Sequence, residues 1–76
     1  MNMTDAYNLD RGDRIRYKGS PVIYKVLGTT QVKMRSGIWV KGIRYAPEDL
    51  DVDDPEYDEY TKTYDKIAEG FKLVQD

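Results

Sequence analysis

Charged side chains that could bind a partner or an ion gather in two stretches of opposite sign. The first 46 residues carry nine lysines and arginines against three acids, and the remaining residues carry three lysines against eleven acids. Eight of those acids occupy twelve positions, residues 48–59. This division predicts two surfaces of opposite potential on one small body.

The basic side chains recur at alternate positions, as they do on one face of a β-strand. The predicted basic face consists of Arg14, Arg16, Lys18, Lys33 and Arg35. Closely placed cations release counterions from nucleic acid, so this face is a candidate for phosphate binding. The alternative is an ordinary outward-facing sheet surface, where cations discourage edge-to-edge aggregation.

The acidic stretch admits three interpretations. An EF-hand calcium loop fails on spacing, because counting from Asp51 places Glu56 at the glycine position and Lys62 at the bidentate glutamate position. A looser cation site, a mimic of a nucleic-acid strand that occupies a basic groove on a partner, and a solvated loop remain open. The candidate contact residues of this segment are Asp51, Asp53, Asp54, Glu56, Tyr57 and Tyr60.

Neither histidine nor cysteine occurs in the chain. These two side chains supply most proton shuttles, nucleophiles and zinc ligands near neutral pH, so we expect no enzymatic activity, no metal and no cofactor. The absence of cysteine and of an apolar N-terminal run predicts a cytoplasmic protein without membrane contact.

Alternation and turn residues predict short strands over residues 14–18, 22–27, 32–35, 38–46 and 60–64, followed by a helical turn over 65–70. Gly28 is expected to end the second strand, and Ser36-Gly37 to form a tight turn. Gly42 indicates a bulge or bend inside the fourth strand. Residues 1–10 lack periodicity and predict a flexible arm ahead of a single domain over 11–76, with an acidic loop at 47–59.

The predicted core combines aliphatic residues with aromatic ones, because the aliphatic residues alone are too few. Its predicted members are Ile15, Tyr24, Val26, Val32, Ile38, Val40, Ile43, Phe71 and Leu73, with Trp39, Tyr45 and Tyr64 completing the interior. Short strands with glycine at the corners favour an all-β fold, or a mainly-β fold with one short helical turn, in the form of a small SH3-like antiparallel barrel. An open sheet with a C-terminal helix is the alternative.

Two strings carry a family resemblance: Arg16-Tyr17-Lys18-Gly19, followed by Tyr24-Lys25-Val26-Leu27-Gly28. They resemble the opening of a family of short bacterial and phage proteins of unknown function that share a KG-x-Y-x-V-L-G hairpin. The resemblance spans roughly residues 12–74 and departs from the pattern at Pro21-Val22 and at the acidic insertion. It implies an SH3-like fold and a bacterial or phage origin, and it implies no activity.

The sequence therefore predicts a small non-enzymatic module, a monomer or weak dimer, that binds a host protein. A nucleic-acid-binding module that uses the basic strand face is the alternative. Fold analogy alone supports the word binding at this stage.

Overall fold

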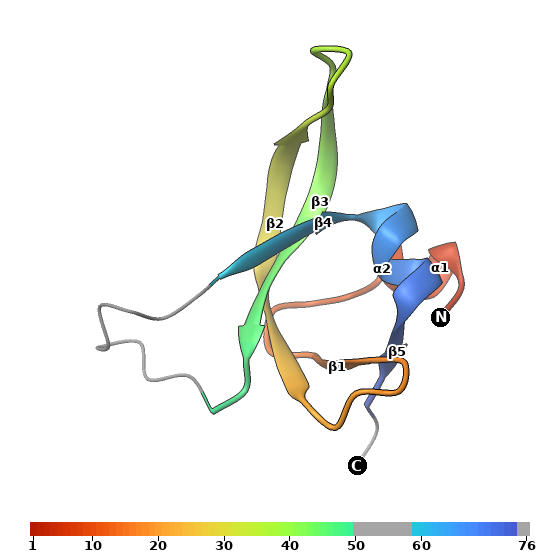
Figure 1. Cartoon of the computed structure of the whole chain (residues 1–76), viewed down its shortest axis with the longest axis vertical. Helices are drawn as coiled ribbons and strands as arrows, with labels where there is room; N and C mark the ends of the chain where they lie inside the picture. Colours follow the sequence, from red (N-terminus) through yellow and green to blue (C-terminus); the bar gives the residue numbers. More distant parts are fainter. Residues whose placement is uncertain (50–58, 75–76) are drawn as a thin grey trace.

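The computed structural model describes residues 1–49 and 59–74, and its strands form one antiparallel sheet (Figure 1). The strands are β1 (Arg14–Tyr17), β2 (Ile23–Lys33), β3 (Trp39–Pro47), β4 (Tyr60–Thr63) and β5 (Phe71–Leu73). Their order in the sheet is β4-β3-β2-β1-β5, so β4 and β5 are its two edges. The mainly-β prediction is confirmed, whereas the described sheet is not closed into the predicted barrel.

Strand β2 is one long strand where the sequence predicts two. Val26 pairs with Tyr45 and Gly28 pairs with Arg44, which leaves Leu27 as the extra residue of a β-bulge. The bulge bends the strand and lets it continue past the glycine that was expected to end it. With 11 residues, β2 is also longer than β3, which has 9.

Gly42 permits a close approach of two strands. The sequence predicts a bulge or a bend at this position, and the strand pairing has no bulge there. Gly42 pairs in regular register with Thr30. A Cβ atom built on Gly42 would lie 2.5 Å from the carbonyl oxygen of Lys62 in β4. Glycine is therefore needed here because any side chain would push β4 away from β3.

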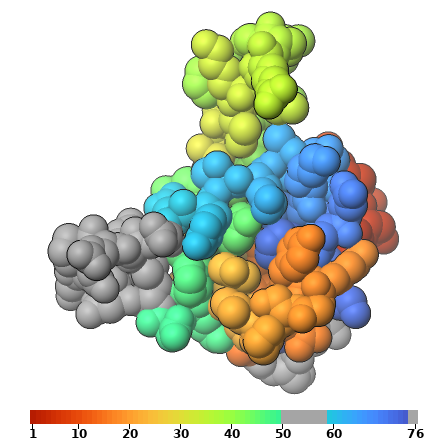
Figure 2. Space-filling model, viewed as in Figure 1, coloured from red at the N-terminus to blue at the C-terminus, as the bar shows by residue number. Residues whose placement is uncertain are grey.

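The predicted turn at Ser36-Gly37 is confirmed. The backbone N–H of Gly37 donates to the carbonyl of Met34 at 2.9 Å, and the N–H of Met34 donates to the carbonyl of Ile38 at 2.8 Å. On the N-terminal side of Gly42, β3 no longer pairs with β4, so this part of β3 and its partner β2 continue toward the turn as a two-stranded ribbon. We call residues 31–41 the hairpin arm, which projects from the body of the molecule (Figures 1 and 2).

Two short helices, α1 (Met3–Tyr7) and α2 (Tyr64–Gly70), pack against each other beside the sheet (Figure 1). The predicted helical turn near residues 65–70 is confirmed by α2. The rings of Tyr7 and Tyr64 join the two helices, with centroids 4.6 Å apart.

The N-terminal residues differ from the flexible arm that the sequence predicts. The side chain of Asn2 accepts a hydrogen bond from the N–H of Asp5 and caps α1. Ala6 is fully buried and Leu9 is 8% exposed, and both belong to the core. A helix of five residues is too short to show a helical period, which explains why the pattern was missed.

The core lies between the sheet and the two helices. Its buried apolar residues are Ala6, Leu9, Ile15, Val26, Ile43, Tyr45, Ala46, Tyr64, Ile67 and Phe71, and Tyr24 packs partly buried against them. Burial is thus confirmed for most of the predicted core.

Five predicted core residues lie outside it, which corrects the sequence analysis. They are Val32, Ile38, Trp39, Val40 and Leu73. Val32 is half-buried, and the other four are exposed, Ile38 to 64% and Trp39 to 59%. The reason is tertiary: all but Leu73 lie on the hairpin arm, which no other strand of the described sheet covers.

Within the described residues, neither helix is long and apolar enough to cross a membrane.

Replacing Ile43 with alanine should lower the free energy of unfolding by about 2 to 4 kcal/mol, because a fully buried side chain leaves a cavity. Trp39→Ala should cost less than about 1 kcal/mol, because the indole is mostly exposed. Urea denaturation followed by circular dichroism measures both. A larger loss for Trp39→Ala than for Ile43→Ala would contradict the placement of the tryptophan outside the core.

Replacing Leu9 with alanine should cost about 2 kcal/mol, since its side chain packs in the core. Met3→Ala is the matched control, because Met3 lies in α1 but is 38% exposed. The same denaturation experiment applies. Equal stabilities of wild type and Leu9→Ala would return residues 1–10 to the flexible arm that the sequence predicts.

Candidate functional site

The structure separates the predicted basic face into three parts. Arg14 and Arg16 alternate with buried Ile15, so both lie on the outer face of β1. Arg14 is half-buried, and its Nε lies 2.6 Å from a carboxylate oxygen of Glu48. Arg16 stands opposite Lys72 of β5 on the same face.

The other predicted cations lie elsewhere. Lys33 ends β2 on the hairpin arm, and Arg35 lies in the turn of that arm. Lys18 follows the end of β1 and donates its backbone N–H to the carbonyl of Gly70 at 2.9 Å. The five predicted residues therefore do not form one continuous basic surface.

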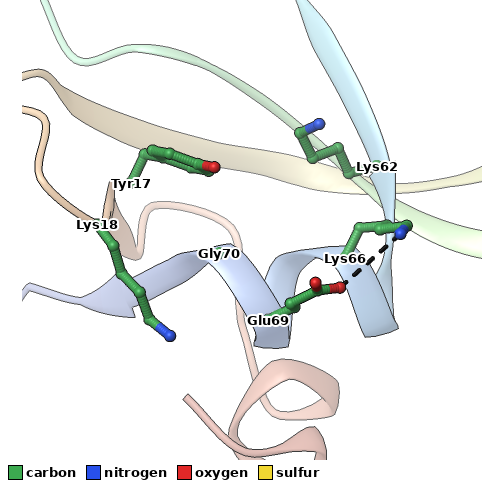
Figure 3. Close-up of a pocket in the computed structure, with 6 residues that line it drawn as sticks. All are labelled: Tyr17, Lys18, Lys62, Lys66, Glu69 and Gly70. Carbon is green, nitrogen blue, oxygen red and sulfur yellow. Dashed lines mark ion pairs between the residues drawn. The ribbon is translucent and has the colours of Figure 1, made fainter.

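Lysines from three different elements surround a cleft that the sequence analysis did not predict (Figure 3). The cleft has a volume of about 380 Å³ and lies between the end of β1, β4 and α2. Its lining residues are Tyr17, Lys18, Lys62, Lys66, Glu69 and Gly70. Lys66 and Glu69 form an ion pair of 3.8 Å, and the other two lysines are exposed.

An aromatic cavity of about 320 Å³ adjoins this cleft, because both are lined by Tyr17 and Lys62. Its other lining residues are Tyr24, Tyr45, Tyr60 and Phe71. We call the two together the tyrosine–lysine groove. The alternation of β4 places Tyr60 and Lys62 on the same face, which turns both toward the groove.

The rings of the groove support one another through edge and stacking contacts. Tyr45 and Phe71 meet edge-on at 5.2 Å, and Tyr24 meets Tyr45 edge-on at 5.3 Å. Tyr60 stacks on Tyr45 with an interplanar angle of 27° and a centroid distance of 5.6 Å. These are the geometries that aromatic pairs prefer, so the floor of the groove is a rigid cluster.

Burial raises the pKa of the Tyr45 hydroxyl to about 12, and the neighbouring Tyr24 and Tyr60 add to the rise. The buried phenol is therefore held in its neutral form. It can accept or donate a hydrogen bond, but it does not supply a negative charge at neutral pH.

The hairpin arm exposes apolar residues on one face. Val32 pairs with Val40 across the two strands. Met34 lies opposite Ile38 at the turn, where its N–H donates to the carbonyl of Ile38. Met34, Ile38 and Val40 are 45%, 64% and 39% exposed. On the other face, the ammonium of Lys33 lies 6.0 Å from the ring centre of Trp39.

A second, apolar groove continues from the arm toward the helices. It has a volume of about 510 Å³, and its lining residues are Met3, Tyr7, Met34, Val40, Lys41, Thr63, Tyr64 and Asp65. The pKa of the Asp65 carboxyl is lowered, chiefly by a hydrogen bond from the hydroxyl of Thr63. The carboxylate of Asp65 and the cation of Lys41 therefore both line this mainly apolar groove.

Most of the predicted acidic contact segment falls outside the described residues. Asp51, Asp53, Asp54, Glu56 and Tyr57 all lie there, so their prediction stays untested. Tyr60 is described and is 43% exposed. In residues 1–49 and 59–74, histidine, cysteine, aspartate and glutamate form no group of three or more that could hold a metal ion.

Comparison with protein-family models, with curated proteins and with solved structures finds no match to this chain.

The raised pKa of Tyr45 has a measurable consequence for stability. Because its pKa in the folded protein exceeds the ordinary value of about 10, the neutral form contributes stability that is complete below pH 10 and is lost as the pH rises toward 12. Chemical denaturation at several pH values should show this fall. Tyr45→Phe should have a shallower fall, and equal slopes would show that Tyr45 ionises normally.

Proposed function

We propose that this protein is a non-enzymatic binding module that recognises a partner protein through the apolar face of its hairpin arm. The observation that carries this proposal is the exposure of Met34, Ile38 and Val40 side by side on a projecting ribbon. An isolated two-stranded hairpin is marginally stable in water. A partner that covers the apolar face would bury this surface and stabilise the arm.

The arm also supplies the residue types that dominate protein interfaces. Met34 on the apolar face is 45% exposed and Trp39 on the opposite face is 59% exposed, and both residue types are enriched at interfaces. The charged residues of the arm are Lys33, Arg35 and Lys41, of which Lys33 and Lys41 alternate with the apolar face, and residues 31–41 contain no acid. This pattern favours a partner surface in which apolar residues are bordered by carboxylates.

The remaining sequence expectations belong to the same proposal. The absence of histidine and cysteine supports a non-enzymatic role, a cytoplasmic location and function without a cofactor. Five antiparallel strands, a bulge in β2 and a helical turn between the last two strands support membership of the SH3-like class. The protein acts as a monomer or weak dimer that binds a host protein.

Nucleic-acid binding through the predicted basic strand face has weaker support. Arg14 is paired with Glu48, and Lys33 and Arg35 lie on the arm, away from Arg16. Only two of the five predicted cations therefore share the outer face of β1.

An arm variant with Ile38→Asp and Val40→Asp should lose the partner protein, because it places two charges in the apolar contact. Val22→Asp is the matched control, since Val22 is 42% exposed and lies in the β1–β2 connection. Immobilised wild type, arm variant and control are incubated with a bacterial lysate, and the retained protein is identified and its affinity measured. The arm variant should bind it at least about thirtyfold more weakly, the scale of an interface hot spot. Undiminished binding to the arm variant would place the contact elsewhere.

A further inference from the structure

We propose that the tyrosine–lysine groove is a binding site for single-stranded nucleic acid, separate from the hairpin arm. Bases stack on the open faces of Tyr17 and Tyr60, and phosphates contact Lys18, Lys62 and Lys66. Grooves that bind single strands combine these two features, aromatic faces for the bases and cations that follow the backbone.

The two tyrosines at the groove present rings that are held but not covered. Tyr60 stacks on Tyr45 and meets Tyr24 edge-on at 6.1 Å, and it is still 43% exposed. Tyr17 is 50% exposed, and its ring meets Phe71 edge-on at 5.4 Å. A ring fixed in this way loses little conformational entropy when a base stacks on it.

Gly70 provides the space in which the Tyr17 ring lies. A Cβ atom built on Gly70 would lie 2.8 Å from Cε2 of Tyr17. The absence of a side chain at Gly70, the last residue of α2, therefore leaves room for the Tyr17 ring, and Lys62 and Lys66 lie across from that ring (Figure 3).

The lysines are available to an anionic ligand. In the described part of the chain, neither Lys18 nor Lys62 forms an ion pair, and Lys66 has only the exposed pair of 3.8 Å with Glu69. Exposed pairs of this kind contribute little free energy and are easily exchanged for a phosphate. The charged residues that line the groove are therefore three lysines and one glutamate.

The shape and charge of the groove favour a single strand over other anions. The aromatic part and the lysine part are adjacent and share two residues, so a ligand must offer rings and negative charges in repeated succession. A nucleic-acid strand carries one phosphate for each base, whereas a duplex hides its bases. The formal net charge of the chain is −2, so the protein as a whole does not attract polyanions and affinity must come from the groove.

The charge of the groove can be tested with two variants that lose the same number of positive charges. The groove variant has Lys18→Gln, Lys62→Gln and Lys66→Gln. The matched control, the arm-charge variant, has Lys33→Gln, Arg35→Gln and Lys41→Gln. Fluorescence anisotropy measures binding of a labelled thymidine hexanucleotide at several salt concentrations. The groove variant should bind at least about tenfold more weakly than wild type, and its slope of log affinity against log salt should fall by roughly 2, as three lost contacts require. The affinity of the arm-charge variant for the hexanucleotide should stay within about threefold of that of wild type.

The stacking contacts are tested with Tyr60→Leu, which keeps an apolar side chain but removes the ring. Tyr7→Leu is its matched control, because Tyr7 is 61% exposed and lies outside the groove. Tyr60→Leu should weaken hexanucleotide binding about fivefold or more, the lower end of the range for one stacked base, and Tyr7→Leu should not. Thermal denaturation of every variant establishes that each is folded at the temperature of the measurement.

Four results would overturn the proposal. The first is that wild type shows no saturable binding of the hexanucleotide at low salt. The second is that the groove variant and the arm-charge variant lose the same affinity for the hexanucleotide, and the third is that Tyr60→Leu loses none. The fourth uses competitors: inorganic polyphosphate, or a peptide of alternating glutamate and tyrosine, displaces the hexanucleotide at lower concentration than unlabelled hexanucleotide does. The polyphosphate result would indicate a plain anion site, and the peptide result would indicate a protein site.

Discussion

Burial of four aliphatic side chains holds the sheet to its C-terminal helix. Ile15, Val26, Ile43 and Ile67 are each 0–1% exposed, and they come from β1, β2, β3 and α2. Each of these elements is too short to be stable alone, so its position depends on contact with the others. With 76 residues and no cysteine, the chain has no disulfide to replace this packing.

The small size of this core determines what is left on the surface. Aromatic residues pack with the aliphatic ones: Tyr45 and Phe71 are buried, while Tyr17 and Tyr60, which contact them, remain partly exposed. The same packing leaves the end of the β2–β3 hairpin without a covering element. The candidate binding surfaces are therefore the parts of the sheet that the core is too small to enclose.

Those two surfaces differ in chemistry and lie on different parts of the molecule. The hairpin arm has one apolar face and carries three basic residues, and the tyrosine–lysine groove is aromatic with three lysines. The lining residues of the groove and the residues of the arm do not overlap, so a protein partner and a nucleic-acid strand would not compete for the same side chains. Both proposals can hold together, in which case the module would link its two ligands.

The sequence by itself determined the mainly-β class, the tight turn before Ile38, the helical turn after β4 and the burial of residues such as Ile15 and Phe71. These follow from local causes, namely the period of side chains along a strand and the backbone preferences of glycine. Tyr60, which the sequence predicts as a candidate contact residue, is exposed in the structure.

Only the tertiary structure decided which alternating residues face the core and which face solvent. Trp39 occupies the same alternate positions of β3 as Ile43 and Tyr45, but β4 pairs with β3 only from Gly42 onward, and Trp39 is exposed while the other two are buried. Likewise, Lys18 and Lys62 are 44 positions apart and meet at one groove through the packing of α2 between β4 and β5. Periodicity describes one element at a time, whereas exposure and convergence depend on which elements pack together.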